Sequence, residues 1–270
     1  MLTRNQTKVL IPIFLVLLVL IMNPSISCSQ TQPTLTIFAA AAARSPLDEI
    51  CQQFEEQYKA SVEINYGGGG EVLSQMVLSQ SGDVYIAPEQ RFMETAKEKQ
   101  AIDPETIKSI AYMVPVIAVP KSNPNNITSL ADLAKPGIRV AVTRPETTLL
   151  GNYAPEIFQK SGLAEEIKNN IVTEAARPDN LLTLLMMGQV DAGIIWHFYQ
   201  VQAAEYIEAI FLPADQLTGI GEMQAAISTY SNHKTLAQKF VVFLVSENSK
   251  SIFEDAGYIV NAEEVKQYWQ

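Results

Sequence analysis

One stretch of the chain combines residues suited to binding an anion. Residues Leu35–Phe38 are apolar and predict a buried strand, and five alanines follow directly, up to Ala43. Because alanine side chains are small, backbone N–H groups at this turn can approach a ligand closely. A helix is expected to begin near Ser45 and Pro46, and its N-terminus offers unpaired N–H donors and a partial positive charge. Arg44 adds a full charge, so the stretch predicts an anion-binding turn, with an ordinary strand-to-helix turn as the alternative.

Four consecutive glycines, Gly67–Gly70, form a second candidate site. They follow Val62–Tyr66, whose alternating pattern predicts a strand, and precede a helix in which Val72, Met76 and Leu78 are expected to face the core. Successive glycines allow several backbone N–H groups to converge on an anion. The run lacks the G-x-G-x-x-G spacing of a dinucleotide site. An anion nest is therefore the main interpretation, and a flexible turn without a ligand is the alternative.

The residues that could carry catalysis or hold a metal are not arranged for either role. The sequence has no G-x-S-x-G motif, and neither of its two histidines is placed to activate a serine. His197 and His233 are expected to be structural or surface residues, although His197 could instead line a cleft. No zinc-ligand spacing is present, and a carboxylate pair of Glu146 and Glu222 is a weaker hypothesis for a metal or metal–oxyanion site. We therefore expect a protein that is not an enzyme and holds no cofactor or metal of its own.

The first 27 residues predict a signal peptide. Arg4 and Lys8 precede the apolar run Val9–Met22, which at about 14 residues is shorter than the roughly 20 of a membrane-spanning helix. Ser25 and Ser27 fit the small residues of a cleavage site, and Cys28 follows directly. The expected location is outside the cytoplasm, either free in the periplasm or tethered to the outer face of a membrane by a lipid on Cys28.

Charge and cysteine usage limit the possible partners. The formal net charge is −10, and removing the two basic residues of the signal peptide makes it −12. Such an acidic chain is not expected to bind nucleic acid or anionic lipid. The two cysteines give no disulfide framework. Cys51 has apolar neighbours on a helical pattern and is expected to be a buried thiol, with a pair to Cys28 as the alternative.

Strands and helices alternate along the mature region, which predicts an α/β fold with mostly parallel sheets and helices on both faces. The apolar stretch Ala111–Pro120 has a proline in its middle and is expected to change sheets there. A second crossing is expected near Gly221–Ala225. These crossings divide the chain into a discontinuous first lobe, residues 33–112 plus 224–270, and an inserted second lobe, residues 113–223. Strand ends and helix N-termini of two such lobes face one cleft, where ligands bind.

Several stretches, in a shared order, resemble the periplasmic molybdate/tungstate-binding proteins of ABC-type transporters, which belong to the type II periplasmic binding proteins. The matching stretches are TIFAAAA at Thr36–Ala42, the turn at Tyr66–Gly70, GDVYIAPEQRFMETAKEKQAID at Gly82–Asp103, VAVTRPETTLLGNYAPEI at Val140–Ile157, GQVDAGIIW at Gly188–Trp196 and AQKFVVFLVSENSKSIFEDAGY at Ala237–Tyr258. The resemblance covers essentially the whole mature region. It implies a monomeric two-lobed protein that closes on a small tetrahedral oxyanion and delivers it to a membrane permease.

The resemblance also implies positions for ligand contacts, at which this chain carries different residues. Hydroxyl donors of the family fall on Ala42 and on Gly69, beside Gly70. A backbone donor in the second lobe falls on Leu150, and a helix N-terminal amide falls near Pro178, which has no N–H. A tyrosine hydroxyl falls on Trp196, whose indole N–H can still donate.

Charged residues lie close to the same positions and are expected to replace the missing hydroxyls. Arg44 and Arg177 lie two residues and one residue from a family ligand position, Arg144 begins the expected loop that ends at Leu150, and a guanidinium suits a tetrahedral oxyanion. Thr148, with its neighbour Thr147, is a further donor from the second lobe. The alternative for the arginines is exposure to solvent or pairing with nearby carboxylates.

Molybdate or tungstate, bound through the oxygens around its metal centre, is the expected ligand. The alternatives are another anion, such as sulfate, phosphate or an organic acid, or a sensory or assembly subunit that keeps the fold without transport.

Overall fold

The computed structural model describes residues 32–269, and the predicted signal peptide and Cys28 lie outside this range. Within it, the strands are β1 (Thr34–Ala40), β2 (Ser61–Gly67), β3 (Val84–Ala87), β4 (Lys108–Met113), β5 (Pro115–Pro120), β6 (Val140–Thr143), β7 (Ile171–Ala175), β8 (Ala192–Trp196), β9 (Ile207–Phe211) and β10 (Gly221–Ile227). The α-helices are α1 (Arg44–Tyr58), α2 (Gly69–Ser79), α3 (Gln90–Glu98), α4 (Leu130–Leu133), α5 (Leu149–Lys160), α6 (Ala164–Asn170), α7 (Pro178–Met186), α8 (Tyr199–Gln202), α9 (Lys234–Leu244), α10 (Glu247–Asp255) and α11 (Ala262–Val265). Short 3-10 turns occupy Ala41–Ala43, Pro104–Thr106 and Ala214–Gln216.

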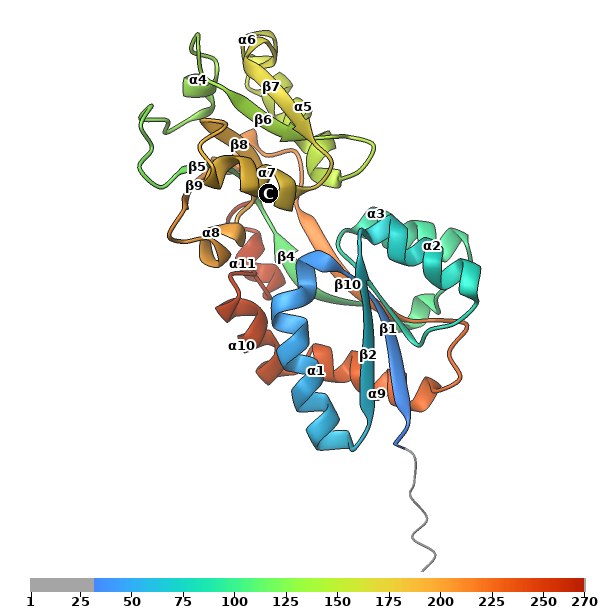
Figure 1. The fold of residues 1–270 in the computed structure, drawn as a ribbon. Coiled ribbons are helices and arrows are strands. Elements are labelled where there is room, and N and C mark those ends of the chain that lie inside the picture. The colour runs from blue at the N-terminus through green and yellow to red at the C-terminus, as the bar shows by residue number, and fades with distance from the viewer. Residues whose placement is uncertain (1–31, 270) are drawn as a thin grey trace, which may run out of the picture. The chain divides into compact units, whose positions relative to one another are not determined.

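The strands form two five-stranded sheets, and each sheet with its helices is called a lobe here (Figure 1). The first sheet has the order β2-β1-β3-β10-β4, and the second has the order β7-β6-β8-β5-β9. In each sheet two pairings are parallel and two are antiparallel. The prediction of mostly parallel sheets is therefore wrong. All antiparallel pairings involve β10 in the first sheet or β5 in the second, the two strands that the chain enters directly after a crossing between the sheets.

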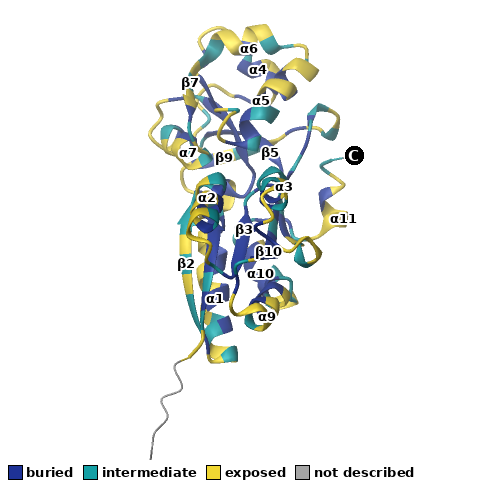
Figure 2. Ribbon diagram, turned by 90° about the vertical axis from the view of Figure 1, so that its right-hand side faces the viewer, coloured by how far each residue is buried: buried dark blue, intermediate teal, exposed yellow. Residues whose placement is uncertain are grey.

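Helices cover both faces of the first sheet, and alternate residues of β1 point to opposite layers. Leu35 and Ile37 belong to a core shared with α1 and α9, whereas Phe38 packs with residues of α2 and α3. This follows from the two-residue period of a strand. The buried strands and the half-exposed helices around them are visible in Figure 2.

The α2 face differs from its prediction. Val72 and Met76 are buried, but Leu78 is 85% exposed, and Leu73 takes its place in the core. Six residues separate Val72 from Leu78, which is not close to a whole number of turns at 3.6 residues per turn. Leu73 lies three residues before Met76 and shares its face.

The chain passes between the sheets at Val114. This single residue separates β4 of the first sheet from β5 of the second, and it is fully buried. His197 holds it in place: the His197 N–H donates to the Val114 carbonyl at 3.0 Å, and the Val114 N–H donates to His197 Nδ1 at 3.0 Å. The return to the first sheet follows residue 211 and ends where β10 begins at Gly221.

Two further observations concern the described residues. Cys51 is 5% exposed, which confirms the expected buried thiol, and burial raises the pKa of this thiol. None of the helices between residues 32 and 269 has the length and apolar character needed to cross a membrane.

Candidate functional site

A cavity of about 410 Å³ has walls contributed by both lobes. The N-terminal ends of four helices meet in these walls: Ala42 and Arg44 at α1, Gly68 and Gly69 at α2, Thr147 and Thr148 before α5, and Arg177 and Pro178 at α7. Each of these helices directly follows a strand or a short turn at the C-terminal end of a strand. Helix N-termini carry partial positive charge and unpaired N–H groups, so the cavity is suited to an anion.

The first-turn N–H groups of α1, α5 and α7 differ in whether they already have a hydrogen-bond acceptor. Among the described residues, neither Ala43 at α1 nor Arg177 at α7 caps its helix through a side chain. At α7, N–H groups that follow Pro178 in the first turn therefore remain for water or a ligand, whereas at α1 the Arg44 N–H donates to the Ala41 carbonyl and Pro46 has no N–H. At α5, by contrast, Thr148 Oγ1 accepts from the Gly151 N–H at 2.9 Å, and the Glu89 carboxylate of the first lobe accepts from the Leu149 N–H.

Arg44 lies in the cavity wall on an aromatic support. The centre of its guanidinium lies 3.9 Å from the ring centroid of Tyr66, whose hydroxyl donates to Asp48 Oδ1 at 2.6 Å. A guanidinium over an aromatic face is held in position while its N–H groups remain free to donate outward. Burial, and then the bond to Asp48, raise the pKa of the Tyr66 hydroxyl, so it remains a donor.

Arg177 enters the same wall from the second lobe. Its Nη2 lies 3.0 Å from Asp179 Oδ2, and both side chains are about half exposed. The carboxylate partner is Asp179, two residues away, so the expected alternative of pairing with a nearby carboxylate applies to this arginine. An exposed pair of this kind contributes little to stability, so Arg177 can exchange its partner for a ligand at small cost.

Close packing around residue 69 leaves no room for a side chain, so this position requires glycine. A Cβ on Gly69 would lie 2.7 Å from Pro88, in the turn between β3 and α3, and 2.8 Å from Phe92 in α3. The Gly69 carbonyl accepts a hydrogen bond from the buried Tyr85 hydroxyl at 3.0 Å. The start of α2 therefore sits directly against the neighbouring turn, where no larger residue fits.

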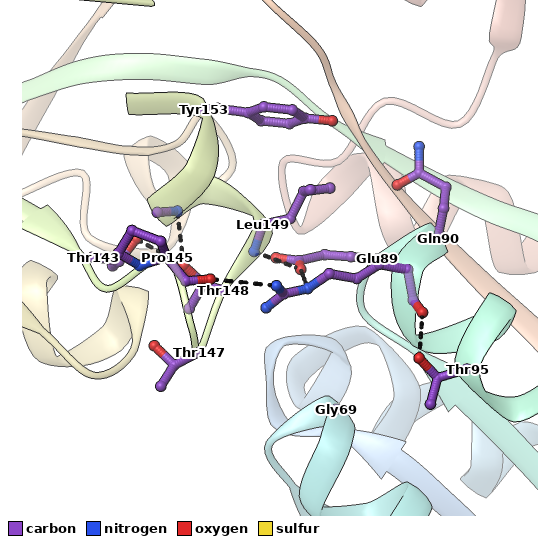
Figure 3. A network of polar contacts seen from close by, with 12 residues as sticks. Gly69, Glu89, Gln90, Thr95, Thr143, Pro145, Thr147, Thr148, Leu149 and Tyr153 are labelled. Atoms are coloured by element: carbon purple, nitrogen blue, oxygen red, sulfur yellow. Dashed lines mark hydrogen bonds and ion pairs between the residues drawn. The ribbon is translucent and has the colours of Figure 1, made fainter. Parts of the chain in front are cut away.

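That neighbouring turn carries a buried carboxylate, Glu89, into the cavity wall (Figure 3). Glu89 is 4% exposed, its Oε2 accepts from the Leu149 N–H at 2.8 Å, and Arg91 Nε lies 3.3 Å from the same oxygen. Burial raises the pKa of Glu89 to about 7, against the lowering effects of Leu149 and Arg91. A carboxyl with this pKa changes charge near neutral pH.

The structure brings most of the predicted site residues together. Those in the cavity wall are Ala42, Arg44, Gly69, Thr148, Arg177 and Trp196. Gly70, Arg144 and Leu150 are not among the residues that line it. Gly70 lies one position further into α2.

Leu150 and Arg144 have different reasons for lying outside the wall. Leu150 was expected to carry a backbone donor for the ligand, but it lies inside α5, which begins at Leu149 after the Thr148 cap, and its side chain is fully buried in the core. Arg144 is exposed, and its carbonyl accepts from the N–H groups of Thr147 and Thr148 in a tight turn.

Sequence reasoning missed several residues of the wall. Glu89, Asp48, Phe92, Met113 and Tyr199 all line the cavity. Glu89 could have been found, because it closely follows the buried strand β3, and the carboxyl ends of such strands meet at the ligand cleft. No group of three or more His, Cys, Asp or Glu side chains within residues 32–269 is arranged to hold a metal ion.

Two mixed α/β sheets with helices on both faces and a cavity walled by both lobes define the type II periplasmic-binding-protein fold. Solved structures share it over most of the chain. The substrate-binding domain of a Clostridium difficile transporter assigned to molybdenum has a TM-score of 0.72 at 22% identity and covers 85% of this chain and 100% of that one. The sulfate-binding protein SubI of Mycobacterium tuberculosis has a TM-score of 0.75 at 17% identity, covering 87% and 89%. PEB3 bound to L-phospholactate has a TM-score of 0.72 at 18% identity, covering 84% and 100%.

The chain belongs to the bacterial extracellular solute-binding protein family, whose sequence profile matches residues 35–259. A protein of Haemophilus influenzae assigned as a binding protein is 26% identical over 225 residues, which are 83% of this chain and 90% of that protein. The molybdate-binding protein ModA of Escherichia coli is 24% identical over 235 residues, covering 84% and 89%. The resemblance to this class of transporter component is thereby confirmed, and the chain is a solute-binding protein of the ABC-transporter type.

Proposed function

We propose that the protein captures a small oxyanion, with molybdate or tungstate as the leading ligands, and delivers it to the membrane permease of an ABC-type importer. The observation that carries this proposal is the meeting of four helix N-termini from two lobes in one cavity. Their partial charges and N–H groups suit an anion of any chemical type. The molybdate-binding relatives support the choice of oxyanion. The protein needs no cofactor for this role and acts as a monomer.

Arg44 and Arg177 are the side chains proposed to select the anion. They come from different lobes and line the same cavity, and each is supported by a neighbouring ring or carboxylate. A charge-assisted hydrogen bond from a guanidinium contributes more than one from a neutral hydroxyl. These residues therefore offset the loss of hydroxyl groups at Ala42 and Gly69.

Closure of the lobes is the proposed mechanism of capture. A ligand that bonds to the α1 and α2 ends in the first lobe and to the α7 end in the second stabilises the arrangement in which all three are close. Rotation would occur at the chain crossings, of which Val114 is one. We propose that the mature protein acts outside the cytoplasm, either free in the periplasm or tethered to the outer face of a membrane by a lipid on Cys28.

An organic acid or phosphorylated acid is a second candidate ligand, because of the size and lining of the cavity. A volume of about 410 Å³ lies within the range of roughly 300–1,000 Å³ typical of sites for organic ligands. Phe92, Met113 and Trp196 give the wall apolar surface that a bare oxyanion does not use. PEB3, which shares the fold, binds L-phospholactate.

The test is thermal unfolding of the mature protein, stripped of bound ligand, against molybdate, tungstate, sulfate, phosphate and a set of hydroxy and phosphorylated acids. A ligand at about 100 times its dissociation constant adds roughly 2.7 kcal/mol, which raises the midpoint by about 5–10 °C for a chain of this size. A shift with molybdate and tungstate alone supports the leading proposal, and a shift with an organic acid supports the second. No shift with any anion overturns both and favours a sensory or assembly role.

Two arginine variants locate the site in the same assay. Arg44→Ala is expected to weaken the effective anion at least about tenfold, the value of a lost charge-assisted bond. Arg144→Ala removes the same charge from an exposed residue outside the cavity wall and is expected to leave the affinity within about twofold. Equal loss in both variants would show that long-range charge, not the cavity, attracts the ligand.

A further inference from the structure

One end of the proposed anion site is already occupied by a negative group of the chain itself. We propose that Glu89 sets the charge selectivity of the cavity: when ionised it fills the N-terminus of α5 as an internal anion and disfavours a dianionic ligand, and when protonated it admits one. Dianion capture is then coupled to the uptake of a proton from solvent by the Glu89 carboxylate. This inference rests on the proposed function, because it concerns the same cavity.

The contacts of Glu89 are those of a bound anion. Its Oε2 lies 2.8 Å from the Leu149 nitrogen, and the Gly151 N–H in the same first turn is taken by Thr148 Oγ1 at 2.9 Å. The resemblance to molybdate binders implied that a ligand would use this helix end, at Leu150. The chain therefore supplies its own carboxylate at Leu149, the residue before the one where a ligand was expected to bind.

The two residues that follow Glu89 form hydrogen bonds to both lobes. Gln90 accepts from the Glu222 N–H at 3.0 Å, and Arg91 Nη1 donates to the Pro145 carbonyl at 3.4 Å. Figure 3 shows Glu89 directed from the turn before α3 towards Leu149. These contacts fix the turn that carries Glu89, and its own contacts to Leu149 and Arg91 hold the carboxylate in the cavity wall, so a ligand must be compatible with its charge.

The ionisable groups around Glu89 decide when it is charged. Arg91 favours the ionised form from 3.3 Å, whereas burial opposes it more strongly and raises the pKa to about 7. Tyr85 of β3 and Tyr153 of α5 face it as neutral phenols, and burial raises the pKa of both. The other charged groups of the cavity wall are Arg44, Asp48, Arg177 and Asp179.

The direction of the coupling follows from these charges. An anion placed in the cavity raises the pKa of Glu89 further, because two negative charges disfavour each other at short range. Binding near neutral pH therefore takes up as much as one proton. Above the pKa of the free protein, the affinity for a dianion is expected to fall by up to about tenfold per pH unit, the limit for coupling to one proton.

The experiment is isothermal titration of molybdate, which stays a dianion over the range, and of perrhenate, a tetrahedral monoanion of similar size, between about pH 6 and 8.5. Wild-type protein is expected to bind molybdate more weakly as the pH rises and perrhenate with a smaller dependence. Glu89→Gln keeps the shape of the neutral side chain, so its molybdate affinity should be independent of pH and at least about tenfold higher than wild type at the upper end. Glu94→Gln, the same change on the exposed face of α3, should reproduce the wild-type profile.

A second measurement keeps the inference testable if Glu89→Gln does not fold. Titration of wild-type protein in buffers of different ionisation enthalpy reports the protons taken up with molybdate. Uptake of a substantial fraction of a proton near pH 7 supports the inference. No proton uptake, or parallel pH profiles for wild type and Glu89→Gln, overturns it and leaves the proposed function intact. If no variant binds any anion, the proposed function fails, and the inference fails with it.

Discussion

The stability of the protein in mild acid should depend on His197, the residue that holds the connection between the sheets. Its Nδ1 accepts the Val114 N–H, so the neutral ring carries its proton on Nε2, which is buried without a hydrogen-bond partner among the described residues. Burial lowers the pKa of His197 from 6.5 to about 4. Protonation would put a second N–H against that of Val114 and bury a charge.

The size of the effect follows from this shift. Between pH 6.5 and 4 the unfolded chain binds a proton at His197 and the folded chain does not, so acid favours unfolding. The contribution is fully present above the unfolded pKa of 6.5 and is lost as the pH falls towards 4. At 1.36 kcal/mol per pH unit, the loss is about 3 kcal/mol in the free energy of unfolding.

His197→Asn separates the charge from the hydrogen bond. The asparagine amide oxygen can still accept from the Val114 N–H, but it does not titrate. Urea unfolding of both proteins should therefore give a difference that changes by about 3 kcal/mol between pH 7.5 and 4 in favour of the variant. Comparison at each pH cancels the titration of the other groups, including Glu89. If the two stability curves run parallel over this range, His197 is not the acid-sensitive group and the reasoning is refuted.

Three further substitutions test the packing around the site and in the first lobe, each by urea unfolding at neutral pH. Gly151→Ala should destabilise by at least about 2 kcal/mol, because its Cβ would lie 2.3 Å from the Arg144 carbonyl oxygen; a neutral result would contradict this close approach. Phe54→Ala should cost about 3–5 kcal/mol, since the ring is fully buried among aromatic rings of α1 and α9. Asp83→Ala removes the acceptor of a β1 N–H at 2.8 Å and a Ser231 hydroxyl at 2.7 Å and should cost about 2–4 kcal/mol; a loss below 1 kcal/mol would mean that water replaces both bonds.

Elements with strong local patterns could be predicted from the sequence. The strand predicted at Leu35–Phe38 is part of β1, the strand predicted at Val62–Tyr66 is part of β2, and Pro115 marks the place where the chain changes sheets. The direction of strand pairing could not be predicted in the same way. The direction of pairing depends on which lobe a strand enters after a crossing, and the residues of β10 themselves do not indicate this lobe.

The candidate site shows the same division between local and distant information. Arg44 was found because it lies where a predicted strand gives way to a helix, and that order fixes the end of the sheet at which it lies. Arg177 was found from its place next to a ligand position of the family. Arg144 also lies between a strand and a helix, but it occupies a tight turn. Its position in the sequence does not show whether a side chain of that turn faces the cavity or the solvent. Glu89 was missed as a site residue because its partner, Leu149, lies 60 positions away.

The position of β10 in the first sheet has a consequence for the order in which the lobes can form. All strands of the second sheet lie between residues 115 and 211, whereas the first sheet is interrupted between β3 and β4 until residues 221–227 have been added. As the chain lengthens from its N-terminus, the second lobe can complete its sheet while β4 still lacks its neighbour. The long chain closure between β3 and β10 then makes the first lobe the slower one to assemble. The wall of the cavity that contains Arg44 and Glu89 is thus expected to be completed after the wall formed by the second lobe.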